Sequence, residues 1–501
     1  MKLIKVFLSK LYIYLLLIVI QMFYVFILFT YLTDINQYVN AGFTLFSLGI
    51  VLWLVNKEEN LNYKIGWIII VLVFPSIGGL MYLMMGNKNA ARFLSRKIRR
   101  GNKKVSQYLL GDDSVKKNII NKNLISLEYL ENLHFPIYKN TDVKYYALGD
   151  DSYYDLLKDL RNAKRFIFME YFIVSKGIMF DSIFAILREK VKEGVEVRFI
   201  YDDFGSISTI PFRFKQKLEK WGIKYVVFNR FVPLFSVSQN HRDHRKICVI
   251  DGYIGYSGGF NLADEYINAK ERFGHWKDAG VRIEGDAVWS LTAMFLSAYY
   301  TYHPKLIENP LIFKSDCITK EYTGYVLPYG DDPLDNEGVG ENVYLNLITH
   351  AAKEIKIMTP YFIIDDTLMK ALKLASRNGI KVKIFTPHIP DKKIVFRVTR
   401  SYYYSLIMDG IEVYEYTPGF LHSKVILVDN KAATVGTINF DYRSLYLHFE
   451  NNILLYQSKA IKDIKEDFIY TESISQRVSM KKARYFKGFI EAVLRLFAPL
   501  L

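Results

Sequence analysis

One short pattern of residues occurs twice in this chain, and it constrains the fold more than any other feature. The first copy runs His244, Lys246, Asp251, Asn261, and the second runs His422, Lys424, Asp429, Asn439. In both copies Lys follows His by two positions, Asp by seven and Asn by seventeen. A single His-x-Lys carries little information, but four identities at fixed spacing in two copies indicate two related half-sites.

Each copy passes through a β-branched, apolar run, KICVID in the first and KVILVD in the second. Residues two apart in a strand point to one face, so His244 and Lys246 are predicted to project together, as are His422 and Lys424. The Asp of each copy is expected to close its strand at a turn. The trailing Gly and Asn are expected on a second element that returns beside the first.

The repeat extends beyond the motifs. RNAKRFIFMEYFIV at 161–174 is similar to HAAKEIKIMTPYFII at 350–364, and GVEVRFIYDD at 194–203 is similar to GIKVKIFTPH at 379–388. Helix-like segments separate these apolar runs, and strands alternating with helices predict parallel α/β units. We expect two α/β halves packed around one pseudo-twofold active site, with the second half opening near Tyr325.

The N-terminal region predicts membrane spans. Residues 11–32 and 65–86 are each uncharged over 22 positions, which is long enough to cross a bilayer. A weaker apolar segment occupies 37–55, so we favour three spans, with two as the alternative. Pro75 and the glycines at 78–79 allow a kink or re-entrant bend. Residues 87–104 hold eight Lys or Arg and no acid, which places the following domain in the cytoplasm.

The net charge of +15 favours a polyanionic partner, either nucleic acid or an anionic membrane. The uncharged spans favour the membrane. The two cysteines, Cys248 and Cys317, cannot form a disulfide framework. Residues 481–501 are interpreted as a basic amphipathic tail that either lies on a membrane surface or docks on the soluble domain.

The paired motifs suit the chemistry of a phosphodiester. One histidine can attack phosphorus and form a phosphohistidine, while the other protonates the departing alcohol and then deprotonates the incoming one. The lysines neutralise the phosphoryl oxygens, aided by the asparagines. Glu450, 28 residues after His422, and Asp278, 34 after His244, are expected to orient the imidazoles. The sequence has no dense cluster with metal-ligand spacing, so we expect no metal and no cofactor.

The duplicated H-x-K-x4-D pattern with its trailing Gly and Asn resembles the phospholipase D superfamily. The segment GWIIIVLVFPSIGGLMYLMMG resembles the membrane-anchoring segment of bacterial cardiolipin synthases. The segments NHRDHRKICVIDGYIGYSGGFNLADEY, GFLHSKVILVDN, VGTINFDYRSLYLHFE and the terminal LRLFAPLL resemble that family too. The resemblance covers nearly the whole chain.

The resemblance implies a reaction in which one phosphatidylglycerol gives its phosphatidyl group to a second, releasing glycerol and forming cardiolipin in the plasma membrane of a bacterium. It implies His244 as nucleophile, with His422 as general acid and base. Lys246, Lys424, Asn261 and Asn439 would surround the phosphate, and Asp251 and Asp429 would organise the structure. The expected segments are a membrane region at 1–110, a first phospholipase D-like half at 120–320 (motif 241–266), a second half at 321–480 (motif 420–445), and the tail at 481–501.

Two positions depart from the family pattern. His448 stands where Asn is expected, and Thr437 follows Gly436 where Gly259 follows Gly258, so Thr437 is a further candidate for phosphate binding. Three alternatives remain open. In the first, the acceptor is water or serine, and the protein is a phospholipase D or a phosphatidylserine synthase. In the second, it is a membrane-tethered nuclease, which would explain the basic charge. In the third, it is a membrane-tethered scaffold that catalyses no reaction. We expect no nucleic-acid partner, and the sequence does not specify an oligomeric state.

Overall fold

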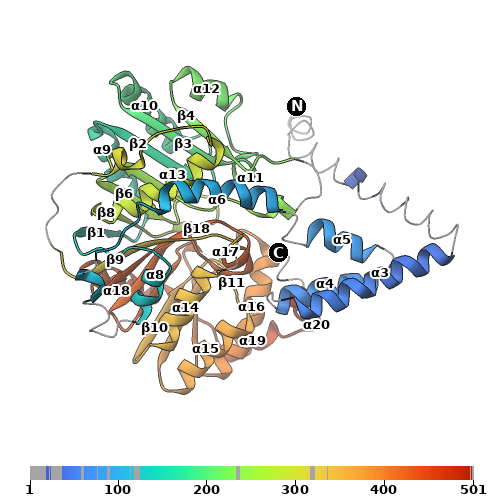
Figure 1. Ribbon diagram of the computed structural model, residues 1–501. Coiled ribbons are helices and arrows are strands. Elements are labelled where there is room, and N and C mark those ends of the chain that lie inside the picture. The colour runs from blue at the N-terminus through green and yellow to red at the C-terminus, as the bar shows by residue number, and fades with distance from the viewer. Residues whose placement is uncertain are drawn as a thin grey trace.

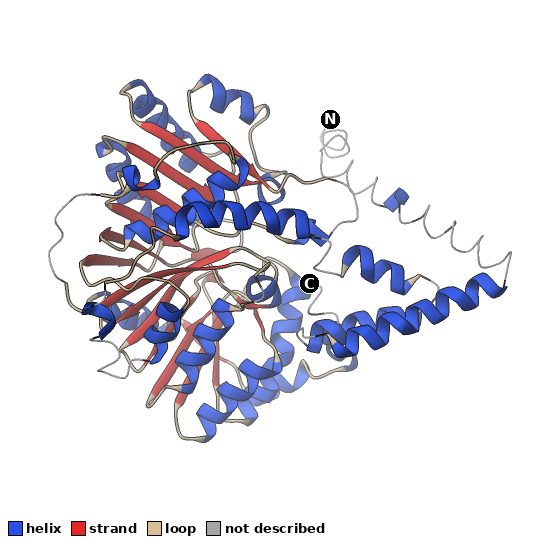
Figure 2. Cartoon of the chain, viewed as in Figure 1, coloured by secondary structure: helices blue, strands red, loops and turns tan. Residues whose placement is uncertain are grey.

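The computed structural model describes residues 19–21, 23, 27, 37–57, 61–75, 77–86, 91–112, 114–117, 125–232, 237–315, 322–335, 337–496 and 498. Its helices and strands form a two-sheet body from which an apolar helical region projects (Figures 1 and 2). The chain crosses from this projection into the body through a basic helix.

The projection consists of α3 (Gln37–Asn56), α4 (Leu61–Val73) and α5 (Gly78–Met85), which contact one another. Within the described residues, α3 is the helix that is long and apolar enough to cross a membrane. The predicted span at 65–86 is not one helix, because it breaks between α4 and α5 near Pro75. Gly78 then lies directly against the backbone of Val71. The predicted span at 11–32 falls mostly outside the described residues.

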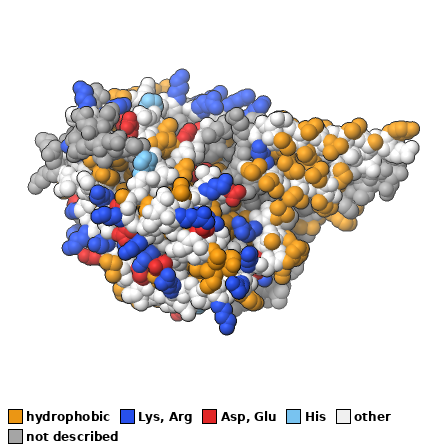
Figure 3. All heavy atoms as spheres, turned by 90° about the horizontal axis from the view of Figure 1, so that it is seen from below, with side chains coloured by type: hydrophobic (Ala, Val, Ile, Leu, Met, Phe, Trp, Pro, Cys, Tyr) orange, Lys and Arg blue, Asp and Glu red, His pale blue; other side chains and the backbone are white. Residues whose placement is uncertain are grey.

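Apolar side chains gather over this projection, whereas Lys and Arg are spread over the body (Figure 3). The basic segment after it forms α6 (Arg92–Ser106). One face of α6 packs on the body through Leu94, Ile98 and Val105. Gly101 allows a close approach to α13 (Val288–Tyr302), since a Cβ there would lie 2.3 Å from Thr301 Oγ1. The remaining faces of α6 present its basic side chains.

The first half contains a seven-stranded sheet in the order β1-β8-β6-β5-β2-β3-β4. Its strands are β1 (Thr141–Tyr146), β2 (Phe166–Tyr171), β3 (Glu196–Asp202), β4 (Lys224–Phe228), β5 (Ile247–Ile250), β6 (Ile254–Gly258) and β8 (Gly280–Gly285). Its helices are α9 (Gly149–Asn162), α10 (Ile178–Lys192), α11 (Asp203–Ser206), α12 (Phe214–Lys220) and α13, with short 3₁₀ turns at Val237–Asn240, Asp264–Ile267 and Pro310–Phe313. Helix α8 (Ile125–Asn132) precedes them in the chain but packs in the core of the second half.

The second half repeats this topology in an eight-stranded sheet, β19-β13-β12-β10-β15-β16-β18-β9. Its strands are β9 (Tyr325–Asp331), β10 (Glu354–Met358), β12 (Lys381–Pro387), β13 (Glu412–Tyr416), β15 (Val425–Val428), β16 (Ala432–Gly436), β18 (Glu450–Tyr456) and β19 (Ser475–Arg477). Its helices are α14 (Val339–Thr349), α15 (Asp366–Arg377), α16 (Lys393–Met408), α17 (Tyr442–Tyr446), α18 (Ala460–Ser473), α19 (Met480–Tyr485) and α20 (Phe489–Leu496). Strands β2, β3, β4, β5, β6 and β8 match β10, β12, β13, β15, β16 and β18 in order.

The sheets are mixed rather than parallel, which differs from the expectation for simple α/β units. In the first sheet, β2, β3 and β4 are parallel, but β5 is antiparallel to both β2 and β6. In the second sheet, β10, β12 and β13 are parallel, but β15 is antiparallel to both β10 and β16. The reason is local, because each motif strand returns through a tight turn. In the first half Asp251 and Gly252 both adopt positive φ there, at 56° and 73°.

The two halves are parts of one folding unit. A single hydrophobic core contains Val249 and Ile283 of the first sheet and Leu427 and Ile453 of the second. Two short parallel pairings also cross between the halves. One joins β7 (His275–Lys277) to β14 (Gly419–Leu421), and the other is a bridge between Asp243 and Phe449. Strand β11 (Phe362–Ile363) pairs with β17 (Phe440–Asp441) within the second half.

The C-terminal tail forms two short helices, α19 and α20, instead of one long amphipathic helix. Helix α20 contacts both α16 and the projecting α4. Glu491 of α20 is buried and pairs with Arg397 at 2.6 Å. Phe489, Ile490 and Val493 on the same helix remain exposed. One face of the tail therefore packs on the body, and its other face exposes apolar side chains.

Candidate active site

The two motif histidines are held by equivalent backbone bonds that cross between the halves. The His244 N–H donates to the carbonyl of Phe449 at 2.8 Å, and the His422 N–H donates to the carbonyl of Lys277 at 2.6 Å. Each histidine lies just before its motif strand, β5 or β15. Each is therefore positioned by its own sheet and by the segment that precedes a strand of the other half.

Each imidazole is also paired with a carboxylate of the other half. His244 Nδ1 lies 2.8 Å from Glu450 Oε2, and His422 Nδ1 lies 2.6 Å from Asp278 Oδ2. Both carboxylates are fully buried. The sequence identified both acids, but their partners are exchanged relative to chain order. Since the carboxylates occupy Nδ1, the Nε2 atoms remain for the substrate.

Burial decides the charge of these pairs. It lowers the pKa of His422 to about 4, and Lys424 nearby acts in the same direction. It also lowers the pKa of His244 well below its ordinary value, with Lys246 adding to the effect. Burial raises the pKa of Glu450. Both shifts favour the neutral forms, and a neutral His244 that donates its one proton from Nδ1 to Glu450 has a free lone pair on Nε2.

The two lysines lie beside the histidines, as the spacing predicted. Lys246 Nζ donates to the His244 carbonyl at 2.6 Å. Lys424 Nζ donates to the His422 carbonyl and lies 2.8 Å from His422 Nδ1. Burial lowers the pKa of Lys246 to about 7 and that of Lys424 to about 8. A phosphate anion in the site would restore both charges, because an opposite charge favours the ammonium form.

The motif aspartates lie away from the histidines, at the far ends of their strands. Asp251 accepts the backbone N–H groups of Lys164, Arg165 and Phe166 at 2.8, 2.7 and 2.9 Å. Asp429 accepts those of residues 352, 353 and 354 at 2.8, 2.7 and 2.9 Å. Each carboxylate fixes the start of the neighbouring strand, β2 or β10. These contacts support the expected role as structural organisers.

The motif asparagines line the cavity wall, and hydrogen bonds to neighbouring residues fix their side chains. Asn261 accepts the Ile173 N–H at 2.9 Å and donates to Tyr266 Oη at 2.6 Å. Asn439 donates to Ser444 Oγ at 3.1 Å. Both asparagines line the same cavity as the two histidines.

Thr437 is placed differently from the sequence expectation. Its hydroxyl donates to Glu450 Oε2 at 2.5 Å, and the residue is fully buried. A contact with a phosphate would therefore require this bond to break. The matching Gly259 has no room for a side chain, because a Cβ there would lie 1.9 Å from Asp278 Oδ1. The space that the Thr437 side chain occupies beside Glu450 is filled by Asp278 at Gly259.

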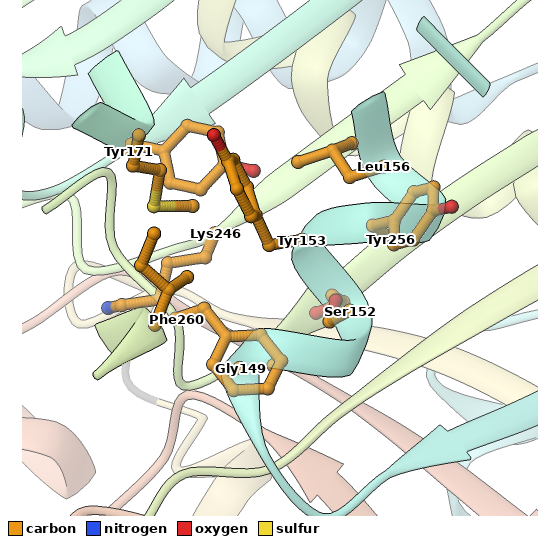
Figure 4. A pocket seen from close by; sticks show the side chains of 12 residues that line it. Gly149, Ser152, Tyr153, Leu156, Tyr171, Lys246, Tyr256 and Phe260 are labelled. Atoms are coloured by element: carbon orange, nitrogen blue, oxygen red, sulfur yellow. The ribbon is translucent and has the colours of Figure 1, made fainter. Parts of the chain in front are cut away.

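The histidines open into one cavity of about 710 Å³ between the halves. Its walls combine aromatic side chains, among them Phe172, Trp276 and Phe420, with charged ones, among them Arg242, Lys392 and Arg443, and Ala498 of the C-terminal segment also contributes. A much smaller pocket of about 20 Å³ is lined by Lys246 together with Tyr171, Tyr256 and Phe260 (Figure 4). That volume suits roughly one water molecule, so the larger cavity is the candidate substrate site.

His448 is a site residue whose place the sequence did not predict. Its ring centroid lies 5.4 Å from that of His244, and it lines the cavity. In the other half-site Trp276 takes this place, also 5.4 Å from its histidine. His448 precedes Glu450 by two positions, as Trp276 precedes Asp278. The departure from Asn was visible in the sequence, but its proximity to His244 depends on the crossing between halves.

Comparisons with known proteins agree with this architecture. A family model described as "Cardiolipin synthase, PLD-like domain" matches residues 156–277 and 344–471, and one described as "Phospholipase_D-nuclease N-terminal" matches 43–87. A cardiolipin synthase of Alkalihalophilus pseudofirmus is 34% identical, with 91% of this chain and 92% of that protein covered. A Streptococcus mutans protein described as uncharacterized is 41% identical, with 91% and 100% covered.

Among solved structures, a phosphatidylserine synthase from Haemophilus influenzae superposes with a TM-score of 0.56. It covers 72% of this chain and 95% of that one, at 15% identity. At this identity the likeness shows the fold alone.

Proposed function

The chain belongs to the cardiolipin synthase family of phospholipase D-like proteins, and from this premise we propose that it transfers a phosphatidyl group between two phosphatidylglycerol molecules. The products would be cardiolipin and glycerol. The observation that carries the proposal is the meeting of two repeated His-Lys half-sites in one cavity, each with a buried carboxylate behind its imidazole.

In the first step, His244 Nε2 attacks the phosphorus of the donor lipid. The negative charge of the bound phosphate favours the protonated form of His422. His422 then gives the glycerol oxygen a proton as the bond from phosphorus to that oxygen breaks, so glycerol leaves. The positive charge that His244 gains on phosphorylation favours the ionised form of Glu450, and this carboxylate accepts the Nδ1 proton and stabilises the charge. Lys246, Lys424 and the two asparagines neutralise and orient the equatorial oxygens. Thr437 acts through its bond to Glu450 and is a positioning residue in this scheme.

In the second step, a primary hydroxyl of a second phosphatidylglycerol enters the position that glycerol left. His422, now neutral, removes its proton, and the oxygen attacks phosphorus while the bond to His244 Nε2 breaks. Cardiolipin forms, and both histidines return to their starting states. No metal or cofactor takes part in either step.

To act on phosphatidylglycerol in the plasma membrane of a bacterium, the catalytic body has to face the lipid headgroups. We propose a multi-pass anchor of two or three spans that includes α3, with the body on the cytoplasmic side where the basic α6 faces anionic lipid. The cavity has the C-terminal segment at its wall, and α20 of that segment contacts the projecting α4. This arrangement suits a substrate whose acyl chains stay in the bilayer.

Product analysis tests the proposal. Purified protein is given phosphatidylglycerol in mixed micelles with excess chelator, and lipids and glycerol are measured by mass spectrometry. We expect one glycerol for each cardiolipin. Phosphatidic acid as the main product would show that water is the acceptor. Phosphatidylserine formed when serine is added would show that the protein is a phosphatidylserine synthase. No lipid product would refute the assignment of a phospholipid substrate.

A further inference from the structure

Three potential metal ligands converge on one side of the cavity, and among the residues that the structure describes no such group lies on the other side. His244, His448 and Glu450 each offer a ligand atom, and these atoms lie within 4.8 Å of one another. His244 Nδ1 is 2.8 Å from Glu450 Oε2, and His448 Nδ1 is 3.7 Å from Glu450 Oε1. A tetrahedral zinc site places its ligand atoms roughly 3.3 Å apart, which lies between these two distances.

A second observation concerns His448 itself. Its Nδ1 atom is buried and has no hydrogen-bond partner among the residues that the structure describes. Its side chain lines the cavity and is 11% exposed, so a solute in the cavity can reach the edge of the imidazole ring. An unsatisfied buried nitrogen is costly, and a ligand bound to it would remove that cost.

From this cluster we propose that the cavity holds an inhibitory site for a borderline transition-metal ion such as Zn²⁺, formed by His244, His448 and Glu450. Two imidazoles and one carboxylate are a usual zinc ligand set, with a fourth position open to water or a phosphate oxygen. The half-site of His422 lacks the third ligand, because Trp276 stands in place of His448. The site is therefore expected to bind one ion and not two.

Metal binding would prevent His244 from acting as a nucleophile, because it changes which ring nitrogen carries the proton. In the free site, an ionised Glu450 would accept the proton that a neutral His244 carries on Nδ1. An ion bound at Nδ1 displaces that proton to Nε2, and an Nε2 that carries a proton has no lone pair with which to attack phosphorus. Lys246 and Arg443 lie near the cluster and repel a cation. We therefore expect weaker binding than in a structural zinc site, and release by chelator.

Direct binding tests the site without any turnover. Co²⁺ is titrated into the full-length His422→Ala protein in detergent, and the visible absorption of low-coordinate Co²⁺ is recorded with calorimetry of Zn²⁺ in parallel. We expect one ion per chain. His448→Asn, made in the same background, should weaken binding at least about tenfold. His350→Asn, at an exposed histidine outside the cluster, should leave binding unchanged.

A failure to bind, or equal binding by the His448→Asn protein with an unchanged melting temperature, would overturn the proposal. If His448→Asn unfolds, His448→Gln replaces it. A second measurement rests on the proposed function, namely Zn²⁺ inhibition of cardiolipin formation, compared as a fraction of each variant's own activity. Binding without any measurable synthase activity would refute the proposed function and retain the metal site, whereas binding without inhibition would overturn the inhibitory role.

Discussion

At the scale of single residues, the site depends on carboxylates that never touch the substrate. Glu450 and Asp278 act through Nδ1 of the histidine from the other half. Which half supplies the carboxylate could not be predicted from the sequence, because offsets of 28 and 34 residues do not specify a crossing. The histidines and lysines were predictable, since a spacing of two places them on one face of a strand, and the asparagines were expected on the element that returns beside it.

Replacing these carboxylates by amides should impair catalysis while leaving the fold intact. Glu450→Gln and Asp278→Asn keep the volume but favour the wrong imidazole tautomer, so we expect kcat to fall roughly 10²- to 10⁴-fold. Nitrogen-15 NMR of labelled histidine should show an altered tautomer in each variant. A kcat within about threefold of the original protein, with the tautomer changed, would refute the positioning role.

The buried lysines set the pH range of the free enzyme. The ammonium form is the active one, and it is lost as pH rises through about 7 for Lys246 and about 8 for Lys424. The alkaline limb of kcat/KM should therefore fall between these values. The limb of kcat should lie higher, since bound phosphate favours the ammonium. Activity that stays constant up to pH 10 in both parameters would contradict this account of the lysines.

The motif aspartates should matter for stability and not for chemistry. Asp251→Asn and Asp429→Asn each weaken three hydrogen bonds to backbone N–H groups, and we expect a loss of about 1–2 kcal/mol in the free energy of unfolding. Thermal unfolding in detergent and kcat at low temperature separate the two effects. A folded variant with an unchanged melting temperature and a kcat lowered a hundredfold would place the aspartate in the reaction instead.

At the scale of elements, the sequence predicted the motif strands and the preceding repeat, because long β-branched runs recur at matched positions. It also predicted the return of each motif strand through a turn at Asp251 or Asp429, where the backbone has positive φ. It did not predict that β5 pairs antiparallel with β2, and β15 with β10. The break between α4 and α5 had a visible signal in Pro75. The division of the tail into α19 and α20 follows from tertiary contacts, above all the burial of Glu491 against Arg397.

The exposed apolar face of α20 should serve reaction at a bilayer. Changing Phe489, Ile490 and Val493 together to Ser removes apolar contacts worth about 1.5–3 kcal/mol per fully buried side chain, so the rate on phosphatidylglycerol vesicles should fall roughly tenfold or more. The rate on dispersed short-chain phosphatidylglycerol should stay unchanged. Ile469→Ser, at an exposed position on α18, is the matched control. Equal losses on both substrates would refute the interfacial role.

At the scale of the whole molecule, the halves cannot act separately, because each histidine takes both its backbone bond and its carboxylate from the other half. The pseudo-twofold site nonetheless has unequal sides. His448 lies beside His244 and Trp276 beside His422. This inequality gives the two imidazoles different surroundings and is consistent with their different roles, His244 as nucleophile and His422 as acid and base.

Trapping the covalent intermediate tests this division of roles most directly. The His422→Ala protein is given a phosphatidyl ester of p-nitrophenol, whose departure needs no acid catalyst. We expect a burst of about one nitrophenolate per chain, no further turnover, and a phosphatidyl group on the peptide that contains His244. The His244→Ala protein should show no burst. A burst from His244→Ala, with the label on His422, would reverse the assignment, and the absence of a burst from both proteins would contradict the phosphohistidine mechanism.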